Sequence, residues 1–180
     1  VMLHGWGASI DLVWPLAEGL AADGYRVYAL DLPGFGQSDE PPQAWSVFDY
    51  AKFVITYLDH HQLTQVRLFG HSFGGRLGLI LGAEHPDRIQ QMVLAGSAGV
   101  VTPLPLMTRV RLSIYKAIRD GLYKVGARST ADKLRAWYGQ RYGSSDYKDS
   151  SGVMRATMVK VVNQDLREYA ARVSASTLLL

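Results

Sequence analysis

The sequence predicts an α/β fold in which helices cover both faces of a mostly parallel β-sheet. Short segments rich in apolar and β-branched residues alternate with longer segments of helical period over residues 1–95. Such alternation is typical of βαβ units, whose parallel strands are buried between layers of helices. Turns rich in glycine follow three of the strands, at the edge of the sheet where ligands bind in this fold class.

The individual elements follow from periodicity and from residues that start or end helices. Asp11 is the expected N-cap of the first helix, and His85 ends the third because proline disfavours helix at the residue before it. Residues 33–45 are rich in Pro, Gly, Asp and Ser and predict a loop. We expect strands at 1–3, 26–32, 65–70 and 89–95, and helices at 12–22, 48–61 and 73–84.

A change in charge near residue 97 predicts an inserted segment. Residues 1–96 carry 5 Lys/Arg and 10 Asp/Glu, whereas residues 97–180 carry 14 and 6. Residues 99–105 have the composition of a linker, and 106–173 are mostly helical in period, with breaks near 126–129 and 143–152. We therefore divide the chain into a core at 1–98, a helical lid at 99–173 and a return to a core strand at 174–180.

Composition excludes several classes of chemistry. The chain has no cysteine, which excludes disulfides, thiolate catalysis and cysteine-ligated metals, and fits a cytoplasmic location. No apolar run approaches the roughly 18 residues that a membrane-spanning helix needs. Both ends of the chain fall within apolar segments, so we expect both to be truncated and any targeting signal to lie outside the sequence. No metal and no organic cofactor is expected.

The sequence Gly70-His71-Ser72-Phe73-Gly74 predicts a nucleophile on a sharp turn between a strand and a helix. Glycines on both sides relieve steric collision at the turn, so that the serine hydroxyl projects from the sheet. The N-terminus of the following helix directs partial positive charge at the site, which favours developing negative charge. The alternative is an ordinary strand–turn–helix whose serine only caps the helix.

The sequence His4-Gly5-Trp6-Gly7 follows the first strand and predicts part of an oxyanion hole. Such a hole needs two backbone N–H groups aimed at one point, one from the residue after the nucleophile and one from this loop. We assign these donors to Phe73 and Trp6. The glycines let the backbone approach a substrate carbonyl, and His4 is expected to hold the loop in shape rather than act as a base.

The segment DLPGFGQS at residues 31–38 follows the second strand. Gly34 and Gly36 permit a tight reversal, and Asp31 and Ser38 can hydrogen-bond to the local backbone. A functional alternative makes Asp31 the acid of a catalytic triad. Motif order argues against that alternative, because the acid follows the serine in the chain.

Together the motifs HGWG, DLPGFGQS and GHSFGG resemble those of the α/β-hydrolase superfamily, strongly over residues 1–98 and weakly over 174–180. The resemblance is to its small-molecule esterase and C–C hydrolase branches, and implies a serine hydrolase acting by acyl transfer on a small ester. The first two motifs resemble those of pimeloyl-carrier methyl esterases, but His71 stands where a tryptophan would be expected. Ser72 argues against the aspartate nucleophile of the family's dehalogenases and epoxide hydrolases.

The same resemblance implies that the triad acid and histidine lie beyond residue 180, since the family order is serine, acid, histidine. The histidines that are present are expected to be structural or solvated: His60, His61 and His85 at helix ends, and His71 within the turn. Without a base, a serine hydroxyl is a poor nucleophile at neutral pH. We therefore expect the 180-residue chain alone to be inactive.

The basic residues of the lid admit two interpretations. We favour a solvated face of amphipathic helices; the alternative is a basic rim that attracts anionic substrates or, less favoured, a membrane surface. Aromatic residues of the lid line an acyl pocket or pack in its core. These aromatic residues are Tyr115, Tyr123, Trp137 and Tyr138. The basic residues are Arg109, Arg111, Lys116, Arg119, Lys124, Arg128, Lys133 and Arg135.

Several functions stay open beside the small-ester hydrolase. The same machinery can hydrolyse a C–C bond in a diketone-like substrate, and peptidase, thioesterase and cofactor-free peroxidase activities are further options, since fold does not fix function. A hypothesis of another class is a non-catalytic receptor that senses a small molecule. Nucleic-acid binding is not expected, because no recognition motif accompanies the positive charge.

Overall fold

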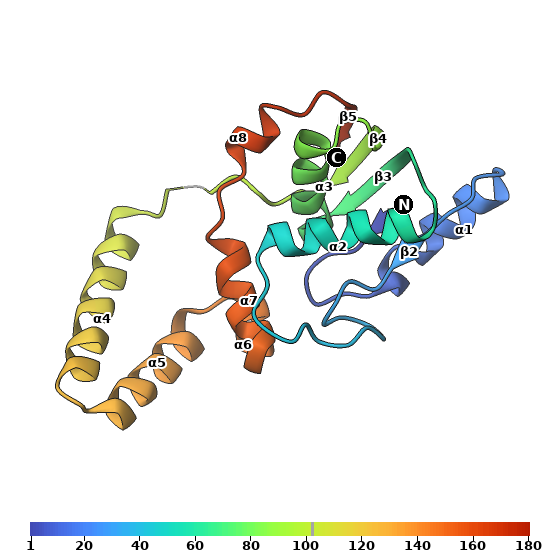
Figure 1. The fold of residues 1–180 in the computed structure, drawn as a ribbon. Helices are drawn as coiled ribbons and strands as arrows, with labels where there is room; N and C mark the ends of the chain where they lie inside the picture. The colour runs from blue at the N-terminus through green and yellow to red at the C-terminus, as the bar shows by residue number, and fades with distance from the viewer. Residues whose placement is uncertain (102) are drawn as a thin grey trace. The chain divides into compact units, whose positions relative to one another are not determined.

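The described residues, 1–101 and 103–180 of a computed structural model, contain five strands that form one sheet in the order β2-β1-β3-β4-β5 (Figure 1). All four neighbouring pairs are parallel, which confirms the predicted fold class. The central strand, β3 (Val66–His71), is flanked by β1 and β4. The others are β1 (Met2–Leu3), β2 (Ala29–Leu30), β4 (Ile89–Ala95) and β5 (Ser176–Leu179).

Helices connect the strands and extend beyond them. The 3-10 helix η1 (Ile10–Leu12) precedes α1 (Trp14–Ala22), and α2 (Val47–His60) and α3 (Phe73–Glu84) follow within the core. The remaining helices lie after β4 in the chain. They are α4 (Leu106–Lys124), α5 (Arg128–Tyr142), α6 (Ser145–Asp149), α7 (Gly152–Val162) and α8 (Arg167–Ala170).

Helices pack on both faces of the sheet, as the sequence predicts. Successive side chains of a strand point to opposite faces, so Met2 and Leu3 of β1 belong to two different cores. Leu3 joins the larger cluster, which includes residues of α2 and α3. Met2 joins a smaller cluster with Val13 and with Ala17 of α1. The residues of β3 alternate between the faces in the same way, which anchors the strand that leads to Ser72.

Two expected elements near the N-terminus differ in the structure. Asp11 does not cap α1; Ser9 caps η1 by accepting a hydrogen bond from the Asp11 N–H at 3.2 Å, and α1 begins beyond it with proline in its first turn. The strand expected at 26–32 is reduced to Ala29–Leu30, because β2 is an edge strand that pairs only with the two residues of β1. By contrast, α3 and β4 have the predicted bounds.

The chain divides into two compact units. The larger comprises Val1–Val101 and Gly152–Leu180, and the other follows Val101 and ends at Ser151. The helices α7 and α8, which lie in the segment expected to be lid, thus belong to the larger unit, where Met154, Thr157 and Val161 are buried. Residue 102, in the expected linker, lies outside the described residues.

A buried cation joins α7 to the helix that follows the turn at Ser72. The Arg76 side chain of α3 is 7% exposed, and its guanidinium donates to the carbonyl oxygens of Val161 at 2.8 Å and Gln164 at 2.9 Å. These carbonyls lie at and beyond the C-terminal end of α7, where a helix leaves acceptors without intrahelical partners. Burial lowers the pKa of Arg76, opposed by Asp165, but arginine keeps its proton in proteins.

Replacing this arginine tests how much α7 depends on it. We expect Arg76→Met to lower the free energy of unfolding by about 2–4 kcal/mol, because one buried and one partly buried carbonyl lose a charged donor. Arg172→Met is the matched control, since Arg172 forms an exposed ion pair with Glu84 that is worth less than about 1 kcal/mol. Urea denaturation measures both values, and equal losses would contradict the structural role of Arg76.

Candidate active site

Ser72 has a strained backbone conformation at the junction between β3 and α3. Its φ is +48° and its ψ is −100°, a region that residues with a Cβ adopt only at a cost in free energy. The neighbouring chain holds it there: the Ser72 N–H donates to Ala95 O at 3.0 Å, and Ser72 O accepts from the Ala98 N–H at 3.3 Å. The end of β4 and the residues after it therefore fix the turn, and the serine side chain stays partly exposed.

Glycines at this turn are required by close backbone contacts. A Cβ at position 70 would lie 2.6 Å from the carbonyl oxygen of Gly74, and a Cβ at position 74 would lie 2.2 Å from that of Leu3. Both distances are shorter than any that real Cβ atoms show, and the opposing atoms are backbone. The glycines thus let β3, α3 and β1 approach one another around Ser72.

The loop after β1 lies directly against the turn. The Gly74 N–H donates to His4 O at 3.1 Å, and a Cβ at Gly5 would lie 3.5 Å from the Cβ of Ser72. The Trp6 and Phe73 rings meet edge to face with centroids 5.3 Å apart. The structure thus brings the two residues assigned to the oxyanion hole together beside Ser72, while their role as amide donors stays a prediction.

His4 is a structural residue, as expected. It is fully buried, its Nδ1–H donates to Gly5 O at 2.7 Å, and its Nε2 accepts from the Leu32 N–H at 3.0 Å. Burial is the main cause that lowers the pKa of His4, so the ring is neutral near pH 7. Both ring nitrogens are engaged, which leaves none to take a proton from Ser72.

Asp31 organises two loops at the same edge of the sheet. Its carboxylate accepts from the Ile10 N–H at 2.8 Å and from the Gln37 N–H at 3.0 Å, and its carbonyl accepts from the Ser38 hydroxyl at 2.7 Å. A Cβ at Gly36 would lie 2.2 Å from the carboxyl carbon. Asp31 therefore joins the loop after β1 to the loop after β2.

Three of the other histidines are placed where they cannot serve Ser72 as a base. His60 and His61 end α2, which leads into the start of β3, and His85 follows α3, which leads into the start of β4. These positions lie at the amino ends of the strands, opposite to the edge that holds Ser72. His71 precedes Ser72, and its Nδ1 is buried and has no hydrogen-bond partner.

An aromatic cluster surrounds the turn and was not predicted. Phe73 is 2% exposed, and its ring contacts those of Tyr50, with centroids 5.0 Å apart, and Phe35, with centroids 6.2 Å apart. Trp45 extends the cluster through an edge-to-face contact with Tyr50 at 5.1 Å. The available signal was that aromatic residues occur in the loops after β1 and β2, but periodicity does not show which loops meet.

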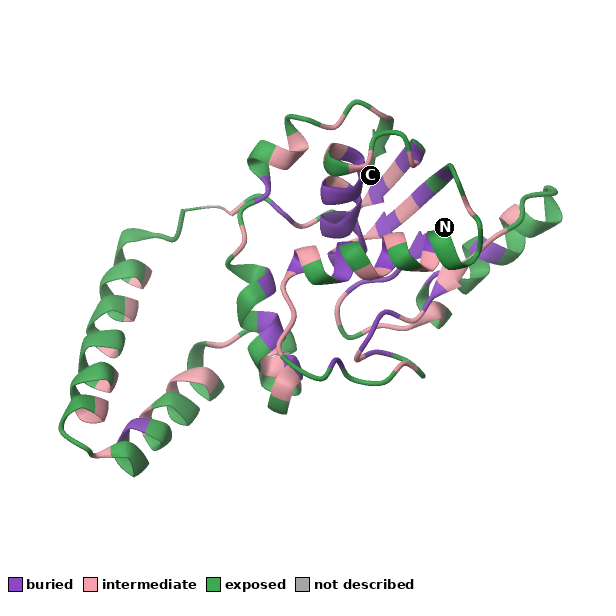
Figure 2. Ribbon diagram, viewed as in Figure 1, coloured by how far each residue is buried: buried purple, intermediate pink, exposed green. Residues whose placement is uncertain are grey.

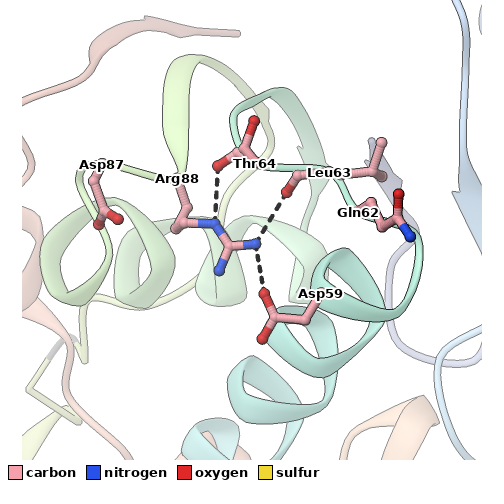
Figure 3. A pocket seen from close by; sticks show the side chains of 6 residues that line it. All are labelled: Asp59, Gln62, Leu63, Thr64, Asp87 and Arg88. Atoms are coloured by element: carbon pink, nitrogen blue, oxygen red, sulfur yellow. Dashed lines mark hydrogen bonds and ion pairs between the residues drawn. The ribbon is translucent and has the colours of Figure 1, made fainter.

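The structure also has a hollow at the amino ends of β3 and β4, with a volume of about 540 Å³ (Figure 3). The side chain of Arg88 spans it, donating to Thr64 O at 2.9 Å and Leu63 O at 3.0 Å and pairing with Asp59 at 2.8 Å. These bonds join the loop before β3 to the start of β4. The hollow lies at the amino ends of the strands, so it is separate from the site at Ser72.

No metal centre is assembled within the described part of the chain, where no three His, Asp or Glu side chains gather as ligands. Two polar side chains near Ser72, those of His4 and Asp31, are committed to backbone hydrogen bonds, whereas the Nδ1 of His71 has no hydrogen-bond partner.

Comparison with the sequences of known proteins identifies the family of the chain. The sequence model described as "alpha/beta hydrolase fold" matches residues 1–167. A 2-hydroxymuconate semialdehyde hydrolase of Pseudomonas sp. strain CF600 is 37% identical over 107 residues, covering 58% of this chain and 38% of that protein. A haloalkane dehalogenase of Mycolicibacterium paratuberculosis is 30% identical over 157 residues, covering 82% of this chain and 52% of that protein.

Solved structures share the fold. An esterase from Exiguobacterium antarcticum aligns with a TM-score of 0.68 at 24% identity, over 99% of this chain and 70% of its own. A meta-cleavage product hydrolase from Pseudomonas fluorescens IP01 aligns with a TM-score of 0.61 at 21% identity, also over 99% and 70%. The chain therefore spans about 38% of the first curated relative's length and about 70% of these solved chains.

The glycine at position 74 offers a direct test of the packing around Ser72. We expect Gly74→Ala to lower the free energy of unfolding by more than about 2 kcal/mol, because its Cβ collides with the Leu3 carbonyl. Gly19→Ala in α1 is the control: nothing lies within 4 Å of its Cβ, so helix propensity should raise stability by about 0.5–1 kcal/mol. Thermal or urea unfolding of both variants checks the contrast in sign.

The buried neutral state of His4 predicts a pH dependence of stability. Its pKa is lower in the folded chain than in the unfolded chain, so below about pH 6.5 the unfolded chain binds more protons. The contribution of neutral His4 to the free energy of unfolding is therefore complete above that pH and decreases as the pH drops below it. We expect His4→Gln to remove this part of the slope between about pH 6.5 and pH 5, whereas His60→Gln at an exposed position retains it. Denaturation at a series of pH values measures the slopes; identical slopes for wild type and His4→Gln would refute the assignment.

Proposed function

The chain belongs to the α/β-hydrolase family, and from this premise we propose that it is a serine hydrolase that acts by acyl transfer on a small ester. Ser72 is the nucleophile, and the amides of Trp6 and Phe73 form the oxyanion hole. In this proposal the helical unit after Val101 belongs to the lid insertion. The substrate is a small molecule with a reactive carbonyl.

The observation that carries the proposal is the conformation of Ser72. A serine that only capped α3 would accept a hydrogen bond from a helix amide, but this N-cap makes no such bond. Its φ of +48° is instead a strained value, held by hydrogen bonds to Ala95 and Ala98 beside two close contacts that require glycine at positions 70 and 74. Strain of about 1–3 kcal/mol persists only where the surrounding structure over-determines it, which is common at catalytic residues.

The proposed reaction begins with attack of Ser72 Oγ on the ester carbonyl carbon. The carbonyl oxygen becomes an oxyanion, which accepts hydrogen bonds from the Trp6 and Phe73 amides. The N-terminal end of α3 adds its partial positive charge. A base takes the Ser72 hydroxyl proton during the attack and returns it to the departing oxygen, so that collapse of the intermediate expels the alcohol and leaves an acyl group on Ser72. Water then removes the acyl group as a carboxylic acid and restores the hydroxyl. One oxyanion donor contributes on the order of 100-fold or more to such a rate.

Activation of Ser72 requires a base, and four of the five histidines are not placed to provide it. His4 has both ring nitrogens engaged, and His60, His61 and His85 lie at the other edge of the sheet. We propose that the acid and the histidine are supplied by sequence outside these 180 residues, and that the 180-residue chain alone is inactive.

The hydroxyl of Ser72 disfavours dehalogenation, although haloalkane dehalogenases are among the relatives. Displacement of a halide by a serine hydroxyl would leave an alkyl ether on the enzyme. Water does not hydrolyse an ether readily, so the enzyme would not be regenerated. Attack on a carbonyl instead gives an ester on Ser72, which the same site can hydrolyse.

A second candidate function is hydrolysis of a C–C bond, which the 37% identity to the 2-hydroxymuconate semialdehyde hydrolase favours. Such a reaction also generates an oxyanion from a ketone carbonyl and uses the same serine and amides. The two functions differ in the leaving group, which is an alcohol in one and a carbon acid in the other. Parallel assays with short p-nitrophenyl esters and a vinylogous diketone distinguish them.

Labelling with a fluorophosphonate tests the nucleophile. We expect the full-length protein to be labelled covalently and Ser72→Ala to lose at least about 1,000-fold in labelling rate, because the reacting oxygen is absent. Ser97→Ala is the control, since Ser97 is an exposed serine near the same turn. Mass spectrometry of the labelled peptides identifies the site.

A second arm tests the missing base. We expect the 180-residue chain, folded as judged by circular dichroism, to react far more slowly than the full-length protein. Ordinary enzymatic turnover of p-nitrophenyl esters by the 180-residue chain would show that one of its own histidines activates the serine. A folded full-length protein that resists the probe would favour the non-catalytic, ligand-sensing alternative.

A further inference from the structure

The helix α7 is amphipathic and buries one of its sides within the larger unit. Figure 2 shows buried and exposed residues alternating along it, and the buried ones recur at intervals of three and four, as expected for one side of a helix. They are Met154, Thr157, Met158 and Val161. No helix in the described ranges, α7 included, is long and apolar enough to cross a membrane. Thr157 is the one polar residue of the four and is fully buried, so its hydroxyl needs a hydrogen-bond partner.

The partner of Thr157 lies at the end of the loop after β2 (residues 33–45). Thr157 Oγ1 accepts from the Trp45 N–H at 3.1 Å, and the Lys160 ammonium donates to Ala44 O at 2.5 Å. The bond to Thr157 is partly buried, whereas the bond from Lys160 is exposed. Water can therefore replace the lysine, but loss of the threonine oxygen leaves the Trp45 N–H without a partner.

The start of the same loop lies against the first turn of α7. A Cβ at Gly34 would lie 2.4 Å from Met154 Sδ, so the methionine side chain occupies the space that the glycine leaves open. The next residue is Phe35, and both Phe35 and Met154 belong to the buried cluster that contains Phe73. The helix α7 thus restrains the loop after β2 at its start and at its end.

This loop contacts both residues assigned to the oxyanion hole. The Phe35 ring meets that of Trp6 edge to face, with centroids 4.9 Å apart, and that of Phe73 at 6.2 Å. From the end of the loop, the Trp45 ring contacts that of Tyr50 at 5.1 Å, and Tyr50 contacts Phe73 at 5.0 Å. A shift of either end of the loop therefore changes what Trp6 and Phe73 pack against.

We propose that Thr157 is a positioning residue for the reaction at Ser72. By accepting from the Trp45 N–H, it holds the loop after β2 in place and keeps Phe35 packed against Trp6, whose amide is assigned to the oxyanion hole. An apolar side chain at position 157 would pack with its buried neighbours but would leave this N–H unpaired. The inference rests on the serine hydrolase function proposed above, and it matters for the rate because a misplacement of about 1 Å at a catalytic group can cost about 100-fold.

Two substitutions of similar size separate the hydroxyl from its packing. Thr157→Val keeps the volume and removes the acceptor, whereas Thr157→Ser keeps the acceptor and removes a buried methyl. We expect Thr157→Val to slow fluorophosphonate labelling of the full-length protein about tenfold, a part of the roughly 100-fold that one oxyanion donor contributes, and Thr157→Ser to slow it less than about twofold. With a p-nitrophenyl ester the loss should appear in kcat at nearly constant KM, because the oxyanion is bound only in the transition state.

Loss of stability alone gives a different result. Thr157→Val and Thr157→Ser should both lower the urea midpoint, since one leaves a donor unpaired and the other leaves a cavity. Ile89→Val is a further control: Ile89 is buried at the start of β4, away from Ser72, and its truncation should lower the midpoint without slowing labelling. Labelling of Thr157→Val at the wild-type rate would overturn the proposal. So would equal slowing of labelling in the two Thr157 variants.

Amide NMR spectra separate this proposal from the assignment of Ser72 as the nucleophile. The backbone signal of Trp6 reports the position of its N–H whether or not the protein is an enzyme. We expect this signal to shift in Thr157→Val and to stay at its wild-type position in Thr157→Ser. If the wild type resists the probe but shows this contrast, the hydrolase function fails while Thr157 still positions Trp6. An unchanged Trp6 signal in Thr157→Val overturns the proposal even where labelling of the wild type is normal.

Discussion

The backbone conformation of Ser72 constrains how three segments of the chain approach one another. At φ +48° the chain reverses from β3 into α3 within one residue, which brings the start of the helix against the end of β1. Only glycine fits at positions 70 and 74, because a Cβ at either would meet backbone atoms. The placement of the loop after β1 depends on this turn, through the hydrogen bond from the Gly74 N–H to His4 O and the contact of the Trp6 and Phe73 rings.

The polar residues near the turn illustrate how the surrounding loops are held. His4 and Asp31 each follow a strand, a position typical of catalytic residues in this fold class. Their hydrogen bonds instead join the loop after β1 to the loop after β2. A rigid arrangement of backbone amides beside Ser72 is what preorganised stabilisation of an oxyanion requires. Polar side chains that fix a loop thus contribute to the proposed reaction without touching the substrate.

The sequence predicts correctly those elements whose bounds depend on neighbouring residues in the chain. The helix at Phe73–Glu84 and the strand at Ile89–Ala95 have the expected bounds, because apolar periodicity and a following proline define them. The role of Arg76 was not predicted, since its partners at Val161 and Gln164 are more than 80 residues away. A cation within an otherwise apolar helix was the available signal, but it does not name the partner. Likewise, β2 is short because it is the edge strand and pairs only with the two residues of β1. The residues of β2 alone do not show that it lies at the edge.

The central claim is that Ser72 reacts at a point served by the amides of Trp6 and Phe73. A crystal structure of the full-length protein inhibited by a small phosphonate tests it most directly. The account predicts phosphorus bonded to Ser72 Oγ and the phosphoryl oxygen about 2.7–3.1 Å from both amide nitrogens. A phosphonate bound to another residue, or a phosphoryl oxygen directed away from both amides, would contradict it.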